Sequence, residues 1–386
     1  MWFPVIIVLI GAVSWCLNLL LGNADLYSFL FWLISYLPNF LLTILVITYS
    51  VHLDFYKIYK VYKFLVYIQS LLLIFSSIKY GVHQVGDAAV GTVGDANFVA
   101  FHILVVILYE IISISVKLNR ERISTQKMTL KFLEIFYFFI VFIIPESTAN
   151  FGFLLIIVSF FLLKEYVLRK LNIIKITLIT GIALLGSVFL SISNQVSIKR
   201  ISGVVDLISD LDFDKISHLS KFNIYKKIIT GEIINGESLI LGLGPSTFTS
   251  RSSVIRMPEE RLNDFALDLP YFKSDHFATF ISPIYSNWRR TKESHGNFAS
   301  PQTSVVSISV ELGLLGLCVF FSYFFLIFKR IKTINLSPKD EHLRKFAFYF
   351  SVFFIINLFY LNFWEYPFMS FTYIIFTFLI LFPKKD

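Results

Sequence analysis

Two groups of basic side chains lie in the longest polar stretch of the chain. The first is Arg251, Arg256 and Arg261, and the second is Arg289, Arg290 and Lys292. An arginine side chain stays charged, and its planar guanidinium binds phosphate oxygens in pairs. The two groups therefore predict a site for an anion such as a diphosphate. A solvated basic surface, or one that attracts anionic lipid headgroups, is the alternative.

Candidate groups for proton transfer lie in the same stretch. They are Asp264, Asp268, Asp275, His276, Glu293 and His295. Histidine and carboxylates are the usual general bases, and we take His295 as the candidate base, with an ordinary surface histidine as the alternative. The stretch lacks a His-x-x-x-His spacing, and Cys16 and Cys318 both lie in apolar runs. We therefore predict no metal site, no cofactor and no disulfide.

A glycine-rich turn, "LGLGPSTF", precedes the first arginine group. Gly242 and Gly244 permit a tight backbone and the close approach of another segment, and Pro245 stiffens the exit from the turn. The spacing of a phosphate-binding P-loop is absent. By itself the motif is also compatible with a plain turn.

Acidic residues occur inside two apolar runs. Glu311 stands in "SVVSISVELGLLGL", where an ionisable group is costly and is a functional candidate. Gly313 and Gly316 in the same run predict the close approach of a neighbouring helix. Glu110 is the second acid, with His102 two turns earlier on roughly the same face. A structural role is the alternative for these acids.

The elements that must position these residues are membrane-spanning helices. Hydrophobic residues make up 56% of the 386-residue chain and charged residues 16%, against about 25% charged in soluble domains. A span needs roughly 20 mostly apolar residues. The pattern predicts spans at 2–21, 27–49, 61–79, 98–117, 130–145, 149–164, 172–193, 303–328, 345–363 and 366–382.

The distribution of basic residues predicts the orientation of these spans. Of the 34 lysine and arginine residues, 20 fall in the connections and the tail on one side, whereas the short connections on the other side hold only Lys79. The positive-inside rule then puts both termini in the cytoplasm. The same rule explains most of the net charge of +8. Nucleic-acid binding would need a basic soluble face, and the sequence does not predict one. The N-terminal run reads as a retained helix.

The polar segment 194–302 follows the seventh span and is therefore predicted to lie outside the cytoplasm. Connections between helices are usually about 2–8 residues long, and much longer ones are usually functional. Within it, 203–216 and 221–234 have helical apolar spacing. The second segment places on one face the apolar side chains Phe222, Tyr225, Ile228, Ile229 and Ile233, and it rests either on the membrane surface or inside the loop. The expected fold is an all-α polytopic membrane protein of about ten helices, with seven spans in 1–193, one large helical periplasmic loop in 194–302 and three spans in 303–386.

This layout, with "GLGPSTF" in the large loop and "ELGLLGL" at the next span, resembles the Wzy-type O-antigen polymerases and the related O-antigen ligases. The resemblance in layout covers most of the chain, and the resemblance in residues covers about 241–248 and 300–317. It implies a glycosyltransferase of the bacterial inner membrane that needs no cofactor. Such an enzyme transfers the growing glycan from undecaprenyl diphosphate to a lipid-linked repeat unit at the periplasmic face.

The resemblance also suggests roles for residues and for partners. Arg251, Arg256, Arg289 and Arg290 are the candidates for binding the diphosphate, and His295 and Glu311 are the catalytic candidates. Donor and acceptor glycans on undecaprenyl diphosphate, together with membrane lipid, are the expected partners, and a chain-length regulator and a flippase are further candidates.

The sequence departs from the ligases at one position. Ligases and many relatives place a His-Asn pair nine residues before the glutamate, where this chain has Gln302 and Thr303. Glutamine is not a general base, so the departure favours a polymerase over a ligase. A polysaccharide flippase or another transporter is the alternative from a different class, although transporters usually have repeats and broken helices with polar residues near the midplane.

Overall fold

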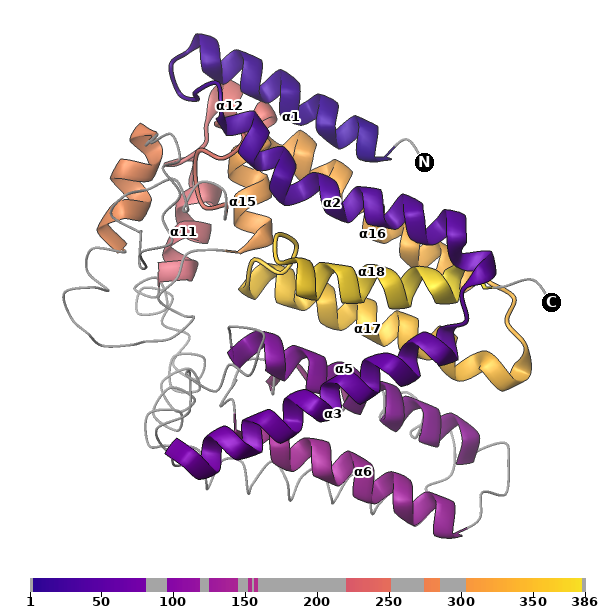
Figure 1. Cartoon of the computed structure of the whole chain (residues 1–386). Coiled ribbons are helices and arrows are strands. Elements are labelled where there is room, and N and C mark those ends of the chain that lie inside the picture. The colour runs from indigo at the N-terminus through magenta and orange to yellow at the C-terminus, as the bar shows by residue number, and fades with distance from the viewer. Residues whose placement is uncertain are drawn as a thin grey trace. The chain divides into compact units, whose positions relative to one another are not determined.

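The computed structural model describes residues 3–80, 96–118, 125–144, 152–154, 156–158, 220–250, 274–284 and 303–383. Within these ranges all regular structure is helical, so the chain is an all-α protein as far as it is described (Figure 1). Five described helices are long and apolar enough to cross a membrane, which identifies a helical membrane protein. They are Ser28–His52, Phe55–Lys79, Asn97–Lys117, Gly313–Thr333 and Pro338–Tyr360.

Several predicted spans coincide with observed helices to within two residues at each end. They are α1 (Phe3–Leu20), α2 (Ser28–Tyr49), α5 (Ala96–Leu118) and α18 (Pro367–Leu381). Three other helices begin before the predicted spans: α3 (Phe55–Tyr80), α6 (Thr125–Ile143) and α17 (Glu341–Tyr360). Their first turns carry Lys57, Lys127 and Arg344, so the helices continue beyond the apolar run that defined each span.

The predicted span 303–328 is two helices rather than one. α15 (Ser304–Glu311) ends at Glu311, and α16 (Gly313–Thr333) begins two residues later. The backbone turns at Leu312 and Gly313, and Gly313 has a positive φ of 68°. Glu311 therefore lies before the candidate span Gly313–Thr333 and not inside it.

Other predictions fall largely outside the described residues. The predicted span 172–193 and the predicted helix 203–216 lie wholly outside them, and 149–164 is described only at 152–154 and 156–158. Of the predicted loop 194–302, the structure describes 220–250 and 274–284. These parts contain α11 (Ser220–Ile229), α12 (Gly236–Leu241) and a π-helical turn, Phe277–Ile281.

The chain divides into two compact units. The first consists of Met1–Thr48, Asp210–Arg330 and Phe354–Ile375. At its centre, the buried Trp364 ring packs against aromatic rings of α2 and α16 at centroid distances of 5.1 to 6.1 Å. The packing brings the start of the chain and its end into one core.

A second apolar core of this unit lies among α11, α15 and the turns between them. It is formed by fully or nearly fully buried side chains: Ile224, Ile233, Ile234, Leu243, Phe248, Phe277, Ile281, Val306 and Val310. Because the predicted loop contributes most of these side chains, its described parts are folded against α15 and are not free surface segments.

The second unit consists of Tyr49–Ser209, Ile331–Phe353 and Phe376–Asp386. In it α3 packs against α5 and α6, and α5 also packs against α6 (Figure 1). α5 is apolar around most of its circumference and almost entirely buried, as expected for a helix surrounded by other helices.

Candidate functional site

The glycine turn packs directly against the junction between α15 and α16. The Leu243 N–H donates to the Val310 carbonyl at 2.8 Å, and the Gly244 N–H donates to the Glu311 carbonyl at 3.1 Å. α15 ends at this point, so its last carbonyls need donors from elsewhere. The turn supplies them, and the two sequence stretches that carry the family resemblance are therefore in contact.

Two glycines make this contact possible. Gly242 has φ +76°, and a Cβ added to it would lie 2.4 Å from the Glu311 carbonyl carbon. Gly313 has φ +68°, and a Cβ there would lie 2.3 Å from the Ile240 carbonyl oxygen. The sequence predicted that Gly313 admits a neighbouring helix, and it admits the C-terminal end of α12, at Ile240, together with Gly242 of the turn that follows.

The carboxylate of Glu311 is held by three backbone N–H groups of the turn. Ser246 donates to Oε2 at 2.8 Å, and Phe248 and Ser250 donate to Oε1 at 3.1 and 3.0 Å. Glu311 is 1% exposed. Both oxygens are therefore occupied by the protein's own backbone, an arrangement suited to fixing the turn.

Ser246 adopts an unusual conformation within this arrangement. Its φ is +58°, and it is the one non-glycine residue with positive φ in the described part of the chain. A left-handed conformation costs a residue with a side chain about 1–2 kcal/mol. The hydrogen bond from the Ser246 N–H to Glu311 Oε2 offsets part of this strain.

Opposing effects act on the ionisation of Glu311. Burial, with a smaller contribution from the Glu365 carboxylate, raises the pKa of Glu311 to about 8. Hydrogen bonds from Ser250 and Ser246 act in the other direction because they stabilise the charged form. The N–H donors of the turn therefore favour the charged form of Glu311, and burial opposes them.

Polar residues of α1 complete the site. Ser14 Oγ donates to the Glu311 carbonyl at 3.2 Å, and Asn18 Nδ2 donates to the Gly242 carbonyl at 3.1 Å. A Cβ at Gly244 would lie 3.0 Å from the Asn18 Cβ. Ser14 and Asn18 are buried, although they sit in an apolar run of the sequence. The sequence offered no pattern that distinguished them.

A second buried carboxylate lies in the same unit. Glu365 is 2% exposed and accepts hydrogen bonds from Tyr36 Oη at 2.9 Å and Asn362 Nδ2 at 2.8 Å. Asn362 in turn accepts from Ser304 Oγ at 3.0 Å, which links this network to the start of α15. Sequence analysis missed Glu365, although the rule that selected Glu311, an acid among apolar residues, also applies to it.

The start of α15 is tied to α11 as well. Thr303 caps α15 by accepting from the Val306 N–H, and the Tyr225 hydroxyl lies 2.9 Å from Thr303 Oγ1. Tyr225 also donates to the Phe359 carbonyl at 2.9 Å, and burial raises the pKa of Tyr225 to about 12. Tyr225 therefore remains a neutral donor at physiological pH.

α11 also carries an unexpected buried amine. Lys221 is 4% exposed, donates to the Tyr360 carbonyl and lies 4.0 Å from the centroid of the Tyr360 ring. Burial lowers the pKa of Lys221 to about 7. No sequence pattern singles out this residue, because a lysine at the start of an amphipathic helix is usually solvated.

The predicted helix 221–234 was too long. α11 ends at Ile229, and Gly231 with φ +76° begins a turn after it. Ile229 was expected on the apolar face with Tyr225 but is 83% exposed, whereas Ile224 is buried. Tyr225 and Ile228 pack against the core shared with α15 as predicted, and Ile224 joins them in place of Ile229.

The structure describes some of the predicted site residues, and the others lie outside the described ranges. Glu311, Gly242, Gly244 and Pro245 come together in one buried arrangement. Another set lies outside the described residues: Arg251, Arg256, Arg289, Arg290 and His295. Arg251 is the residue that directly follows Ser250, whose N–H is bound to Glu311.

The remaining sequence candidates have other surroundings. Asp275 and His276 precede the π-helical turn, where burial lowers the pKa of His276 and Asp275 opposes this effect. His102 and Glu110 belong to the second unit. There the His102 ring lies 2.9 Å from the Tyr62 hydroxyl, and Glu110 forms ion pairs with Lys63 and Lys131.

The site is therefore a fixed backbone turn, residues 242–250, that packs where α15 ends and the candidate span Gly313–Thr333 begins. It excludes water from Glu311 and orients the chain that leads into the first arginine group. Comparison with family models, with curated proteins and with solved structures finds no match to this chain.

Proposed function

We propose that the protein is an O-antigen, or surface polysaccharide, polymerase of the bacterial inner membrane. It transfers the growing glycan from undecaprenyl diphosphate to a lipid-linked repeat unit at the periplasmic face. Both termini lie in the cytoplasm, and the segment 194–302 lies in the periplasm. The partners are the two lipid-linked glycans and membrane lipid, with a chain-length regulator and a flippase acting in the same process.

The observation that carries this proposal is the contact between the glycine turn and Glu311. The resemblance to the polymerases rests on two short stretches, about 241–248 and 300–317, which are far apart in the sequence. In the structure the two stretches meet, because Glu311 accepts hydrogen bonds from the N–H groups of Ser246, Phe248 and Ser250. If each stretch resembled the family only by chance, no contact between the two would be expected.

The proposed reaction breaks the bond between the glycan and the diphosphate. A hydroxyl of the acceptor sugar attacks the anomeric carbon of the donor, a new glycosidic bond forms, and undecaprenyl diphosphate leaves with the bonding electrons. The hydroxyl proton passes to a base, for which His295 is the candidate. Charge develops on the leaving diphosphate, and preorganised cations stabilise a transition state of this kind.

In this scheme Arg251, Arg256, Arg289 and Arg290 bind the diphosphate. Glu311 acts as a positioning residue, because its two oxygens already accept backbone hydrogen bonds and it is almost fully buried. It fixes the chain up to Ser250, one residue before Arg251. In this scheme the glycine turn anchors the chain at Ser250, directly before the first arginine group.

The experiment is a lipopolysaccharide gel of the host strain with the gene deleted and then restored. Deletion of a polymerase leaves lipid A-core that carries a single repeat unit, because export and ligation continue. Restoring the gene returns the ladder of longer chains. An unchanged ladder in the deletion strain refutes the proposal.

The same gel separates the two alternative functions. Bare core with polymer accumulating on undecaprenyl diphosphate indicates a ligase. Bare core with no polymer outside the cell indicates a flippase. Either pattern would contradict the polymerase proposal and assign the protein to another step of polysaccharide export and assembly.

A further inference from the structure

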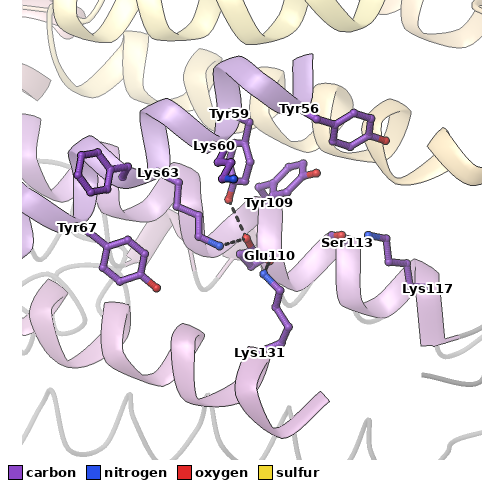
Figure 2. A pocket seen from close by; sticks show the side chains of 11 residues that line it. Tyr56, Tyr59, Lys60, Lys63, Tyr67, Tyr109, Glu110, Ser113, Lys117 and Lys131 are labelled. Carbon is purple, nitrogen blue, oxygen red and sulfur yellow. Dashed lines mark hydrogen bonds and ion pairs between the residues drawn. The ribbon is translucent and has the colours of Figure 1, made fainter. Parts of the chain in front are cut away.

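The second unit contains a pocket that the proposed reaction does not use. It is a cavity of about 370 Å³ between α3, α5 and α6, within the range of about 300–1,000 Å³ typical of small-molecule sites. Four lysines line it: Lys60 and Lys63 of α3, Lys117 of α5 and Lys131 of α6. Figure 2 shows Lys63 and Lys131 reaching Glu110 from α3 and α6.

Two of the lysines are neutralised by carboxylates. Lys63 Nζ lies 2.7 Å from Glu110 Oε1 and 2.5 Å from Glu134 Oε1. Lys131 Nζ lies 2.9 Å from Glu110 Oε2 and 2.8 Å from Glu134 Oε2. The four groups form a closed square in which each charged group contacts two groups of opposite sign, so the net charge of the square is zero.

Lys60 and Lys117 remain as an excess of two positive charges at the same pocket. Within the described residues, neither of them forms an ion pair, and both are exposed. Lysine binds phosphate as a point charge and needs no fixed fork geometry. Lys60 of α3 and Lys117 of α5 line one pocket beside this neutral square, so they offer positive charge to an anion that enters it.

The wall of the pocket formed by α3 is partly apolar. Phe64 lines the pocket and is 62% exposed, and neighbouring exposed side chains of the helix include Val61 and Leu65. Exposed apolar side chains on a candidate span are expected to face acyl chains. A ligand in this pocket therefore contacts lysine side chains within the pocket and the apolar face of α3 beside it.

We propose that this pocket binds a phosphate-bearing anion through Lys60 and Lys117. The phosphate is that of an anionic phospholipid headgroup or of a soluble phosphate compound, and the chemistry of recognition is the same for both. Basic pockets between membrane helices are known binding sites of anionic headgroups. The basic-residue distribution predicts that this end of the helices lies on the cytoplasmic side, so the site is distinct from the proposed diphosphate site.

The test uses the full-length protein purified in a nonionic detergent. One arm titrates mixed micelles doped with phosphatidylglycerol or, for comparison, with phosphatidylcholine, and the other arm titrates inorganic phosphate. Binding is measured by native mass spectrometry for the lipids and by calorimetry for phosphate. The pocket variant is Lys60→Ala with Lys117→Ala, and the control variant is Lys57→Ala with Lys332→Ala.

The control removes the same charge from exposed lysines of the same unit that do not line the pocket. Each lysine near an anionic surface contributes about fivefold to binding, so the pocket variant is expected to weaken it about 30-fold. Lys60→Arg with Lys117→Arg retains the charges and is expected to retain binding.

Each outcome decides the proposal. Preference for phosphatidylglycerol over phosphatidylcholine that is lost only in the pocket variant supports a lipid headgroup. Binding of inorganic phosphate that is lost only in the pocket variant, without a lipid preference, supports a soluble ligand. Binding by neither probe, or an equal loss in the control variant, overturns the proposal.

Discussion

At the scale of single residues, one buried carboxylate organises the site. Glu311 accepts three hydrogen bonds from consecutive parts of the turn, and its carbonyl accepts two more, from Gly244 and Ser14. A buried polar group needs such hydrogen-bond partners. The turn and Glu311 therefore depend on each other, and removing one leaves the other without partners.

Glu311→Gln is expected to destabilise the protein and to abolish its activity. The amide keeps the shape of the side chain but places an NH₂ group against an N–H donor. A buried donor left without an acceptor costs about 1–3 kcal/mol. The measurement is the thermal unfolding midpoint in detergent, together with polymer length in the complemented deletion strain.

Glu232→Gln is the matched control for this experiment. Glu232 lies in the same loop, its side chain is 52% exposed, and its ion pair with Lys227 is long at 4.0 Å. It is expected to leave both readouts unchanged. A Glu311→Gln protein that melts like the wild type contradicts the positioning role.

Lys221→Met is expected to raise the melting temperature most at neutral and lower pH. Burial lowers the pKa of Lys221 to about 7 in the folded state, whereas an unfolded lysine has a pKa of about 10.4. Between these values the unfolded chain binds more protons, so the stability of the wild type rises with pH. The advantage of the variant therefore shrinks from pH 7 to pH 10.

Melting curves of both proteins across that pH window test this expectation. Lys226→Met, on the exposed side of the same helix, is the control and is expected to show no such trend. A constant difference between Lys221→Met and the wild type at all pH values contradicts a buried neutral amine.

The arginines are expected to act as a set. Alanine at Arg251, Arg256, Arg289 and Arg290 removes the proposed diphosphate ligands and is expected to abolish polymer. Lysine at a position that binds two phosphate oxygens retains charge but loses the paired geometry, so partial activity is expected. The ladder on a lipopolysaccharide gel is the readout, and unchanged polymer length in the fourfold alanine variant refutes the diphosphate site.

At the scale of elements, long apolar runs were predictable and distant backbone contacts were not. The bounds of α1, α2, α5 and α18 follow from runs of apolar residues, because a span needs that length in any sequence context. The break between α15 and α16 does not follow, because it depends on α12 and the glycine turn lying against it. Gly242 and Gly313 were visible in the sequence, but their mutual contact was not.

The site itself was partly predictable for the same reason. Glu311 and the glycines were identified because an acid or a tight turn in apolar surroundings is unusual. Ser14, Asn18 and Lys221 were missed, because a small polar residue or a lysine in such a position carries no local signal. Their roles arise only from the partners that the fold brings to them.

Gly242→Ala is expected to be much more destabilising than Gly22→Ala. The two positions have nearly the same φ, +76° and +74°, so both variants bear the cost of a positive φ. Gly242 also has ψ −177°, in a region that residues with a side chain hardly ever adopt, which costs about 1–3 kcal/mol. A Cβ at Gly22 meets nothing within 4 Å, whereas at Gly242 it meets Glu311 at 2.4 Å. The clash is expected to add about 1–3 kcal/mol.

The difference between these two variants in thermal unfolding reports the backbone contact together with the glycine-only conformation of Gly242. Gly313→Ala is expected to resemble Gly242→Ala, since its Cβ meets the Ile240 carbonyl. Equal melting of Gly242→Ala and Gly22→Ala would contradict the close packing of the turn on α15.

At the scale of the whole molecule, two compact units carry two kinds of polar site. The first unit holds the turn, Glu311 and the start of the arginine segment, and the second holds the lysine pocket. In our proposal the first unit carries out the glycan transfer and the second binds a phosphate-bearing anion.

The most direct measurement of the central claim is polymerisation by the purified protein. Full-length protein in detergent is mixed with the repeat unit linked to undecaprenyl diphosphate, and the products are separated by size. The account predicts chains of two, three and more repeat units, with release of undecaprenyl diphosphate and with no product from Glu311→Gln. Repeat units that remain single in the presence of folded wild-type protein would contradict it.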